Sequence, residues 1–76
     1  MNVERLIEMA NDIAHFFAAD PDRQAGLDGV TNHLRKFWEP RMRKQLIAHV
    51  RAHGAAGLHE LARDAVAKLA QGEVAA

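Results

Sequence analysis

The sequence of 76 residues contains no cysteine and no serine, and Thr31 is its only threonine. Without cysteine, the chain can form no disulfide, no thiolate zinc site and no cysteine-ligated iron–sulfur cluster. The serine and cysteine nucleophiles of covalent catalysis are also missing. No glycine spacing matches a phosphate-binding loop, and so small a chain has difficulty enclosing a pocket of about 300 Å³ or more. We therefore predict no catalytic residue and no enzymatic activity for the chain alone.

Long apolar runs are missing as well. No stretch approaches the roughly 20 apolar residues that a membrane span requires. The first residues, MNVERLIEMAND, carry acids where a signal peptide carries positive charge. The absence of cysteine fits a reducing compartment. These features predict a cytoplasmic protein with no membrane contact.

Large apolar side chains are few for a folded domain. The sequence has 22 apolar residues other than alanine, beside 15 alanines that bury little area each. A chain of this length lies near the lower limit for independent folding, and such chains usually need a disulfide, a metal or a partner. We expect a single domain over residues 1–76 whose core is thin and whose stability benefits from a partner.

The apolar residues recur at helical spacing in four segments, and no segment alternates with a period of two. The first stripe runs from Val3 to Phe17, with Asn2 as its N-cap. The stretch Ala19–Gly26 interrupts the pattern with proline, acids and glycine. The second stripe then runs from Leu27 to Phe37, and Trp38 follows Leu34 by four residues.

Pro40 divides the second helix from the third. It disfavours helix at Glu39, and it can itself serve as the first residue of a new helix. We expect that helix to end at Gly54 and a fourth stripe, from Leu58 to Leu69, to end at Gly72. The predicted fold is all-α: a small single domain of four short helices with tight connections. Its ordered core covers about residues 3–70, and residues 71–76 are expected to fray.

Charge is strongly segregated although the net charge is zero. Residues 1–34 carry a balance of −4, and residues 35–51 carry +5, with Glu39 as the only acid among six cations. Such segregation predicts one face that suits an anionic or acidic partner. The plain alternative is a solvated basic helix face.

The five histidines raise the question of a metal site. His49 and His53 are four residues apart, so they share one face of a helix, and His59 follows after the next turn. A zinc site needs three or four ligands, and no acid on this helix has the matching spacing. His53 is explained equally well by its place at a helix C-terminus. We predict no metal site.

The segment HLRKFWEPRMRKQL, His33 to Leu46, combines cations with the only tryptophan. Cations and an aromatic beside a bend are also the materials of a small helix-turn-helix-like or single-strand nucleic-acid-binding module. The neutral chain and its acidic first helix argue against that function. A protein-binding surface is favoured, because Trp38 at a bend is hard to bury in a thin core and Trp and Arg are enriched at binding hot spots. The expected partner-binding residues are Met9, Phe16, His33, Lys36, Phe37, Trp38, Pro40, Arg41, Met42 and Arg43.

Two stretches resemble a known family. MANDIAHFF, Met9 to Phe17, and HLRKFWEPRMR, His33 to Arg43, are similar to the delta subunit of soluble, NAD-dependent, molybdenum-containing formate dehydrogenases. The resemblance covers about residues 3 to 70, and its most specific part is the Phe-Trp-x-Pro-Arg-Met-Arg block. The family more often has Asp before the proline, where this chain has Glu39, a weaker N-cap.

The resemblance implies a non-catalytic subunit that docks on the large (alpha) subunit. It implies that the complex, rather than this chain, carries bis-molybdopterin guanine dinucleotide, iron–sulfur clusters, FMN and NAD. It also implies a role in inserting the molybdenum cofactor or in stabilising the complex, as a transient chaperone or a permanent subunit. The basic residues would then meet acidic protein surface or cofactor phosphates, and both alternatives stay open at this point.

Overall fold

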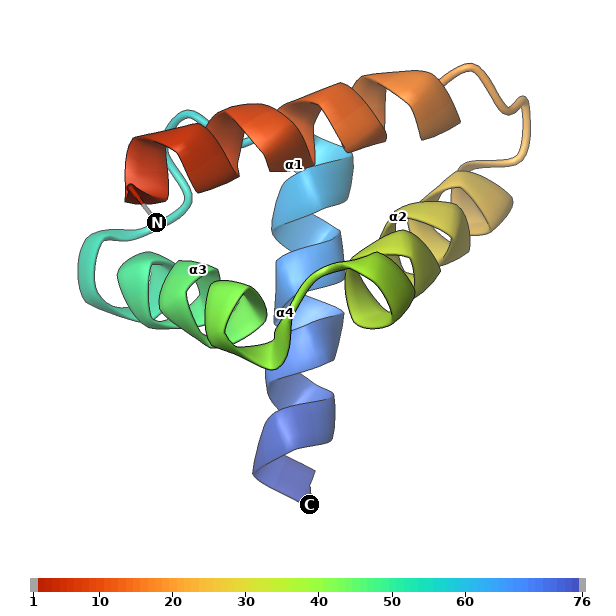
Figure 1. The fold of residues 1–76 in the computed structure, drawn as a ribbon. Helices are drawn as coiled ribbons and strands as arrows, with labels where there is room; N and C mark the ends of the chain where they lie inside the picture. The colour runs from red at the N-terminus through yellow and green to blue at the C-terminus, as the bar shows by residue number, and fades with distance from the viewer. Residues whose placement is uncertain (1, 76) are drawn as a thin grey trace.

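A computed structural model describes the backbone of residues 2–75 and the side chains of residues 2–72. Within that range the chain forms four α-helices and no strand: α1 (Val3–Phe17), α2 (Arg23–Phe37), α3 (Pro40–His53) and α4 (Glu60–Ala75). The predicted all-α fold is confirmed. In Figure 1, α4 runs across the other three helices, which pack around it, and its most extensive contact is with α2. The molecule measures 31 × 27 × 21 Å.

Side-chain caps fix where the first two helices begin. The Asn2 side-chain oxygen accepts a hydrogen bond from the Glu4 amide at 2.7 Å, as predicted for the N-cap of α1. Asp22 accepts from the Gln24 amide at 3.0 Å and starts α2 at Arg23. The expected interruption over Ala19–Gly26 is therefore too long, because the Asp22 cap lets the helix begin within it.

The bend between α2 and α3 follows the predicted chemistry. Glu39 is extended, with ψ 146°, and Pro40 is the first residue of α3. The Glu39 side chain makes no capping hydrogen bond, so backbone geometry alone starts this helix. Gly54 ends α3 with φ 87°, a conformation that favours glycine.

The end of α4 differs from the prediction. The helix continues through Gly72 to Ala75, so Gly72 does not terminate it. Nothing lies within 4 Å of a β-carbon placed at Gly72, so neither space nor a turn requires glycine there. Fraying of residues 71–76 stays a prediction, and Ala76 lies outside the described residues.

The core is built from large aliphatic side chains and from alanine. Its largest fully buried side chains are Leu6, Val30, Leu34, Leu46 and Val66. Four alanines, at positions 10, 14, 62 and 65, are also completely buried. Alanine adds little apolar area, but its small side chain fills the narrow spaces between closely packed helices. The core therefore uses alanines that a count of large apolar residues leaves out.

Two glycines of α2 allow it to approach the end of α1. A β-carbon at Gly26 would lie 2.9 Å from the Phe17 carbonyl oxygen, and one at Gly29 would overlap the Phe17 ring. The ring of Phe17 is therefore seated against the backbone of α2. This contact positions the C-terminal turn of α1, which carries the exposed side chains described next.

Over the described part of the chain, none of the helices combines the length and the apolar character needed to cross a bilayer.

Candidate partner-binding surface

Aromatic rings gather where the end of α1 faces α2. Phe16 and Phe17 lie edge to face with ring centroids 5.0 Å apart. On α2, His33 lies 6.5 Å from Phe17 and 4.8 Å from Phe37. Phe16 is 75% exposed and Phe37 is 72% exposed, and they are the exposed large apolar side chains of the described residues. Rings this exposed add little to folding and are typical of surfaces that bind other molecules.

A hollow of about 360 Å³ lies among these side chains, and we call it the aromatic groove. It is lined by Asp12, Ile13, Phe16, Phe17 and His33. Ile13 and Phe16 share a flank of α1 with Met9, because these residues are four and three positions apart. The flank is only half-buried at Met9 and Ile13. The groove offers an apolar floor with one carboxylate at its edge.

The structure distributes the predicted partner-binding residues over three environments. Exposed at the surface are Phe16, Lys36, Phe37, Pro40 and Arg41. Half-buried are Met9, His33, Met42 and Arg43, while Trp38 is buried. Partner binding by these residues stays a prediction, but their surroundings now differ from one another. Phe16 and His33 line the aromatic groove, and Phe37 contacts His33 beside it.

Trp38 belongs to the core, so the expectation that its ring is too large to bury is wrong. Only 5% of the residue is exposed, and it joins the cluster of buried residues that includes Leu34 and Leu46. Trp38 follows Leu34 by four residues, which keeps it on the buried side of α2. Phe37, one residue earlier, lies on a flank that is exposed at this end of the helix.

Arg43 binds the chain itself. Its Nη1 donates to the carbonyl oxygen of Trp38 at 2.6 Å and to that of Arg35 at 3.2 Å, with a longer contact to Leu34 at 3.4 Å. The Arg35 and Trp38 carbonyls are free acceptors at the end of α2, whereas the Leu34 carbonyl already accepts from the Trp38 amide at 3.2 Å. A cation at this position also interacts favourably with the negative end of the helix dipole. Arg43 therefore ties the first turns of α3 to the last turn of α2.

Five other cations form a separate group, which we call the cationic face: Arg35, Lys36, Arg41, Lys44 and Arg51. All are exposed, and none makes an ion pair or side-chain hydrogen bond with the side chains that the structure describes. The remaining cations outside this group, apart from Arg43, are ion-paired within the chain. The unpaired positive charge therefore lies on the end of α2 and on α3.

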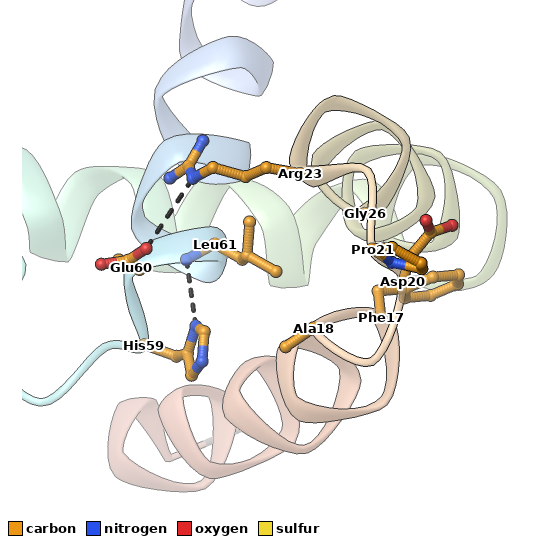
Figure 2. A pocket seen from close by; sticks show the side chains of 9 residues that line it. All are labelled: Phe17, Ala18, Asp20, Pro21, Arg23, Gly26, His59, Glu60 and Leu61. Atoms are coloured by element: carbon orange, nitrogen blue, oxygen red, sulfur yellow. Dashed lines mark hydrogen bonds and ion pairs between the residues drawn. The ribbon is translucent and has the colours of Figure 1, made fainter.

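A second hollow, of about 500 Å³, lies between the turn that joins α1 to α2 and the start of α4 (Figure 2). Its volume is above the roughly 300 Å³ named for an enclosed pocket, but this hollow is open to solvent. Its polar groups, however, are bonded within the chain. Arg23 donates to Asp64 at 2.6 Å and lies 3.7 Å from Glu60. The hydrogen bond from Arg23, supported by Arg63, lowers the pKa of the Asp64 carboxyl.

His59 is a helix cap that the sequence did not reveal. Its Nδ1 accepts a hydrogen bond from the Leu61 amide at 3.0 Å, as Figure 2 shows, and thereby satisfies a free donor at the start of α4. Its ring also meets that of His15 edge to face, with centroids 5.0 Å apart. Histidine is outside the usual set of capping residues, so no sequence signal marked this role.

Asn11 connects α1 with the segment before α4. Its Nδ2 donates to the Gly57 carbonyl oxygen, and its Oδ1 accepts from the His59 amide, both at 2.8 Å. One amide side chain thus satisfies two backbone groups of a segment more than 40 residues away in the sequence. The sequence offered no signal for this contact, because only the folded chain brings the partners together.

Among the described residues, the side-chain donors assemble neither an iron–sulfur site nor a metal site. The sequence has no cysteine for an iron–sulfur cluster. No three His, Asp or Glu side chains within the described range gather into a possible metal site. His49 and His53 lie close, with ring centroids 5.1 Å apart, but two ligands fall short of a zinc site.

The fold and surface define a small all-α protein with an aromatic groove and a separate cationic face. The model of one protein family, NADH-dependent formate dehydrogenase delta subunit FdsD, matches residues 5–66. The match covers most of the 76 residues, and the chain belongs to this family of formate dehydrogenase subunits. A search of curated proteins and a search of solved structures found no match.

Proposed function

We propose that this protein is a non-catalytic delta subunit that docks on the large (alpha), molybdenum-containing subunit of an NADH-dependent formate dehydrogenase. In this role it assists insertion of the molybdenum cofactor or stabilises the assembled complex, in the cytoplasm. The observation that carries the proposal is the pair of exposed rings, Phe16 and Phe37, at the aromatic groove. A family of subunits needs a surface for other subunits, and this groove has the apolar character of such a surface.

The division of labour in the complex follows from the donor set. Bis-molybdopterin guanine dinucleotide, iron–sulfur clusters, FMN and NAD belong to other subunits in this proposal. For the iron–sulfur clusters the support is direct, because this chain has no cysteine ligands. The polar groups of the larger hollow support the same division. His59 and Arg23 hold helix α4 in place through the bonds described above, which leaves them committed to the fold.

Replacement of the exposed rings tests the proposal. Tagged wild-type chain is co-expressed with the other dehydrogenase subunits and purified by its tag, and the molybdenum content of the captured complex is measured. We expect wild type to retain the large subunit, whereas Phe16→Ala/Phe37→Ala loses at least about 2 kcal/mol of binding, or about thirtyfold in affinity. Both rings are exposed, so the variant should keep the helicity and melting temperature of the isolated chain.

His53→Ala is the matched control, because it removes an exposed ring at the end of α3, away from the residues of the groove. It should bind like wild type. The isolated wild-type chain should reduce no NAD with formate. Formate-dependent reduction by the chain alone, or failure of wild type to capture any dehydrogenase subunit, would contradict the proposed function.

A further inference from the structure

We propose that the cationic face binds an acidic segment of the partner protein, in which carboxylates flank a large apolar side chain that packs against Phe37. This inference rests on the proposed function and deepens it by naming the chemistry that the partner presents. It assigns the basic residues to acidic protein surface rather than to cofactor phosphate. The aromatic groove and the cationic face then serve as two parts of one interface.

The cationic face differs from the other cations in having no internal partners. Arg5, Arg23, Arg63 and Lys68 each lie within 3.2 Å of a carboxylate oxygen of the same chain. Arg43 is bonded to backbone carbonyls. The five members of the cationic face have no such partner among the described side chains. Their charge is therefore available to an external partner, whose approach it would steer.

The charges of the cationic face are also spread along the helix axis. Arg41, Lys44 and Arg51 lie on one exposed side of α3, at separations of three and seven residues. At 1.5 Å per residue, they extend over about 15 Å of the helix axis. The Arg43 bond to the Arg35 carbonyl holds the last turn of α2, with Arg35 and Lys36, against the start of this row.

This spread favours several carboxylates over a single phosphate group. A phosphate site brings cations and backbone amides together on one point, often with bidentate arginine. The cationic face instead distributes single charges along a helix, with Glu39 exposed near its beginning. A row of separated carboxylates on a partner segment matches this distribution, since each exposed cation can meet its own acid.

Phe37 supplies the apolar part of the contact. It is 72% exposed and lies in the last turn of α2 with the exposed cations Arg35 and Lys36, so this end of the helix presents both a ring and positive charge. Interfaces with apolar centres and charged margins have this composition. Nucleic acid could also stack on Phe37, but Asp12 at the aromatic groove and the net charge of zero disfavour a phosphate backbone there. A second copy of the chain could offer acids from α1, but unlike patches that meet head to tail need not close into a defined oligomer.

A pair of matched charge reversals tests the inference. Lys44→Glu changes a member of the cationic face, and Arg5→Glu makes the same change in charge at an exposed cation of α1. Both lie in the N-terminal halves of their helices, where an acid is tolerated. Affinity for the purified large subunit of the cognate formate dehydrogenase is measured at low and high salt, and folding is checked by circular dichroism. We expect Lys44→Glu to weaken binding about fivefold at low salt and less at high salt, with Arg5→Glu close to wild type.

The outcomes separate the two proposals. If wild type binds the large subunit and both reversals bind equally well, the inference is wrong while the proposed function stands. If wild type binds no dehydrogenase subunit, both are wrong.

Two phosphate probes, a fluorescent 20-nucleotide oligo(dT) and GDP, test the competing ligand class. Submicromolar binding of either probe would overturn the inference in favour of phosphate if Lys44→Glu abolishes that binding. Concentration-dependent self-association abolished by Lys44→Glu would overturn it in favour of a second copy. If Lys44→Glu loses helicity, Arg41→Glu takes its place in the comparison with Arg5→Glu. Arg41 is also exposed, and the same outcomes apply to it.

Discussion

Trp38 stabilises the junction where α2 meets α3. The backbone of Trp38 is extended, with φ −84° and ψ 140°, and the Trp38 side chain lies in the core. Its carbonyl oxygen also accepts the shortest hydrogen bond from Arg43. Side chain and backbone of one residue therefore hold two helices together. The adjacent Phe37 has neither role, because its ring is mostly exposed.

Trp38→Ala should consequently act on folding. Removal of a buried aromatic costs about 3–5 kcal/mol, which approaches the whole stability of a small domain. We expect the isolated variant to lose most of its helical signal at ambient temperature in circular dichroism. Phe37→Ala, one residue away, should change the free energy of unfolding by no more than about 0.5 kcal/mol. A folded Trp38→Ala with wild-type melting temperature would show that the ring makes no net contribution to the core.

Some features of single residues follow from the local sequence and others depend on the packed fold. The bend at Pro40 and the caps at Asn2 and Gly54 follow from local chemistry, and the structure has them as predicted. The choice between Trp38 and Phe37 for the core depends on which flank of α2 other helices cover. That covering is set by the packing of distant segments, so spacing alone placed Phe37 on the apolar stripe while Trp38 was expected to resist burial.

At the scale of the elements, the contact between α1 and α2 depends on the absence of side chains. Gly26 and Gly29 have no side chains, and the space that this leaves on α2 is filled by the backbone and the ring of Phe17. Half-buried Phe17 packs edge to face against Phe16, and both rings line the aromatic groove. The four helices could be predicted from apolar periodicity, but the contact of Phe17 with Gly26 and Gly29 could not. Two glycines three residues apart do not reveal which segment of the chain packs against them.

Gly29→Ala tests this contact. The new methyl group would overlap the Phe17 ring, and displacing a packed ring costs about 1–3 kcal/mol. Replacing a helical glycine with alanine gains up to about 1 kcal/mol, so we expect a net loss of stability in urea denaturation. Gly72→Ala is the control, because nothing lies within 4 Å of the added carbon and only the gain should remain. Equal stabilisation by both substitutions would mean that Phe17 yields without cost.

On the scale of the whole molecule, ion pairs and unpaired charges are separated in space. Arg23 with Asp64, and Lys68 with Asp28, join α2 to α4, the two helices in most extensive contact. The unpaired cations lie at the other end of α2 and on α3. The sequence showed only that cations concentrate in residues 35–51 and acids in residues 1–34. It could not predict which charges would pair, because each interhelix pair joins residues about 40 positions apart.

The Arg23–Asp64 pair makes the stability of the fold depend on pH. Arg23 holds the folded-state pKa of Asp64 below its ordinary value. A depressed folded-state pKa means that the stabilisation is fully present above the unfolded value, about 3.9, and is lost as pH falls through the folded value. The pair raises the pKa of Arg23 above its ordinary value. Arginine therefore stays protonated over the whole accessible pH range, and only the titration of Asp64 makes the stability depend on pH.

Asp64→Asn should therefore lower the melting temperature at about pH 7 by a few degrees at most, since surface pairs contribute little. The difference from wild type should shrink as the pH is lowered below about 4, where the wild-type carboxyl becomes protonated as well. Thermal melts of both proteins from neutral pH down to about pH 2.5 measure this convergence, and added salt should reduce the difference at neutral pH. Glu60→Gln is the control, because Glu60 lies 3.7 Å from Arg23 rather than 2.6 Å and should show a smaller difference. A gap between wild type and Asp64→Asn that stays constant across the whole range would show that Asp64 acts through neutral hydrogen bonds, and that its charge does not stabilise the contact between α2 and α4.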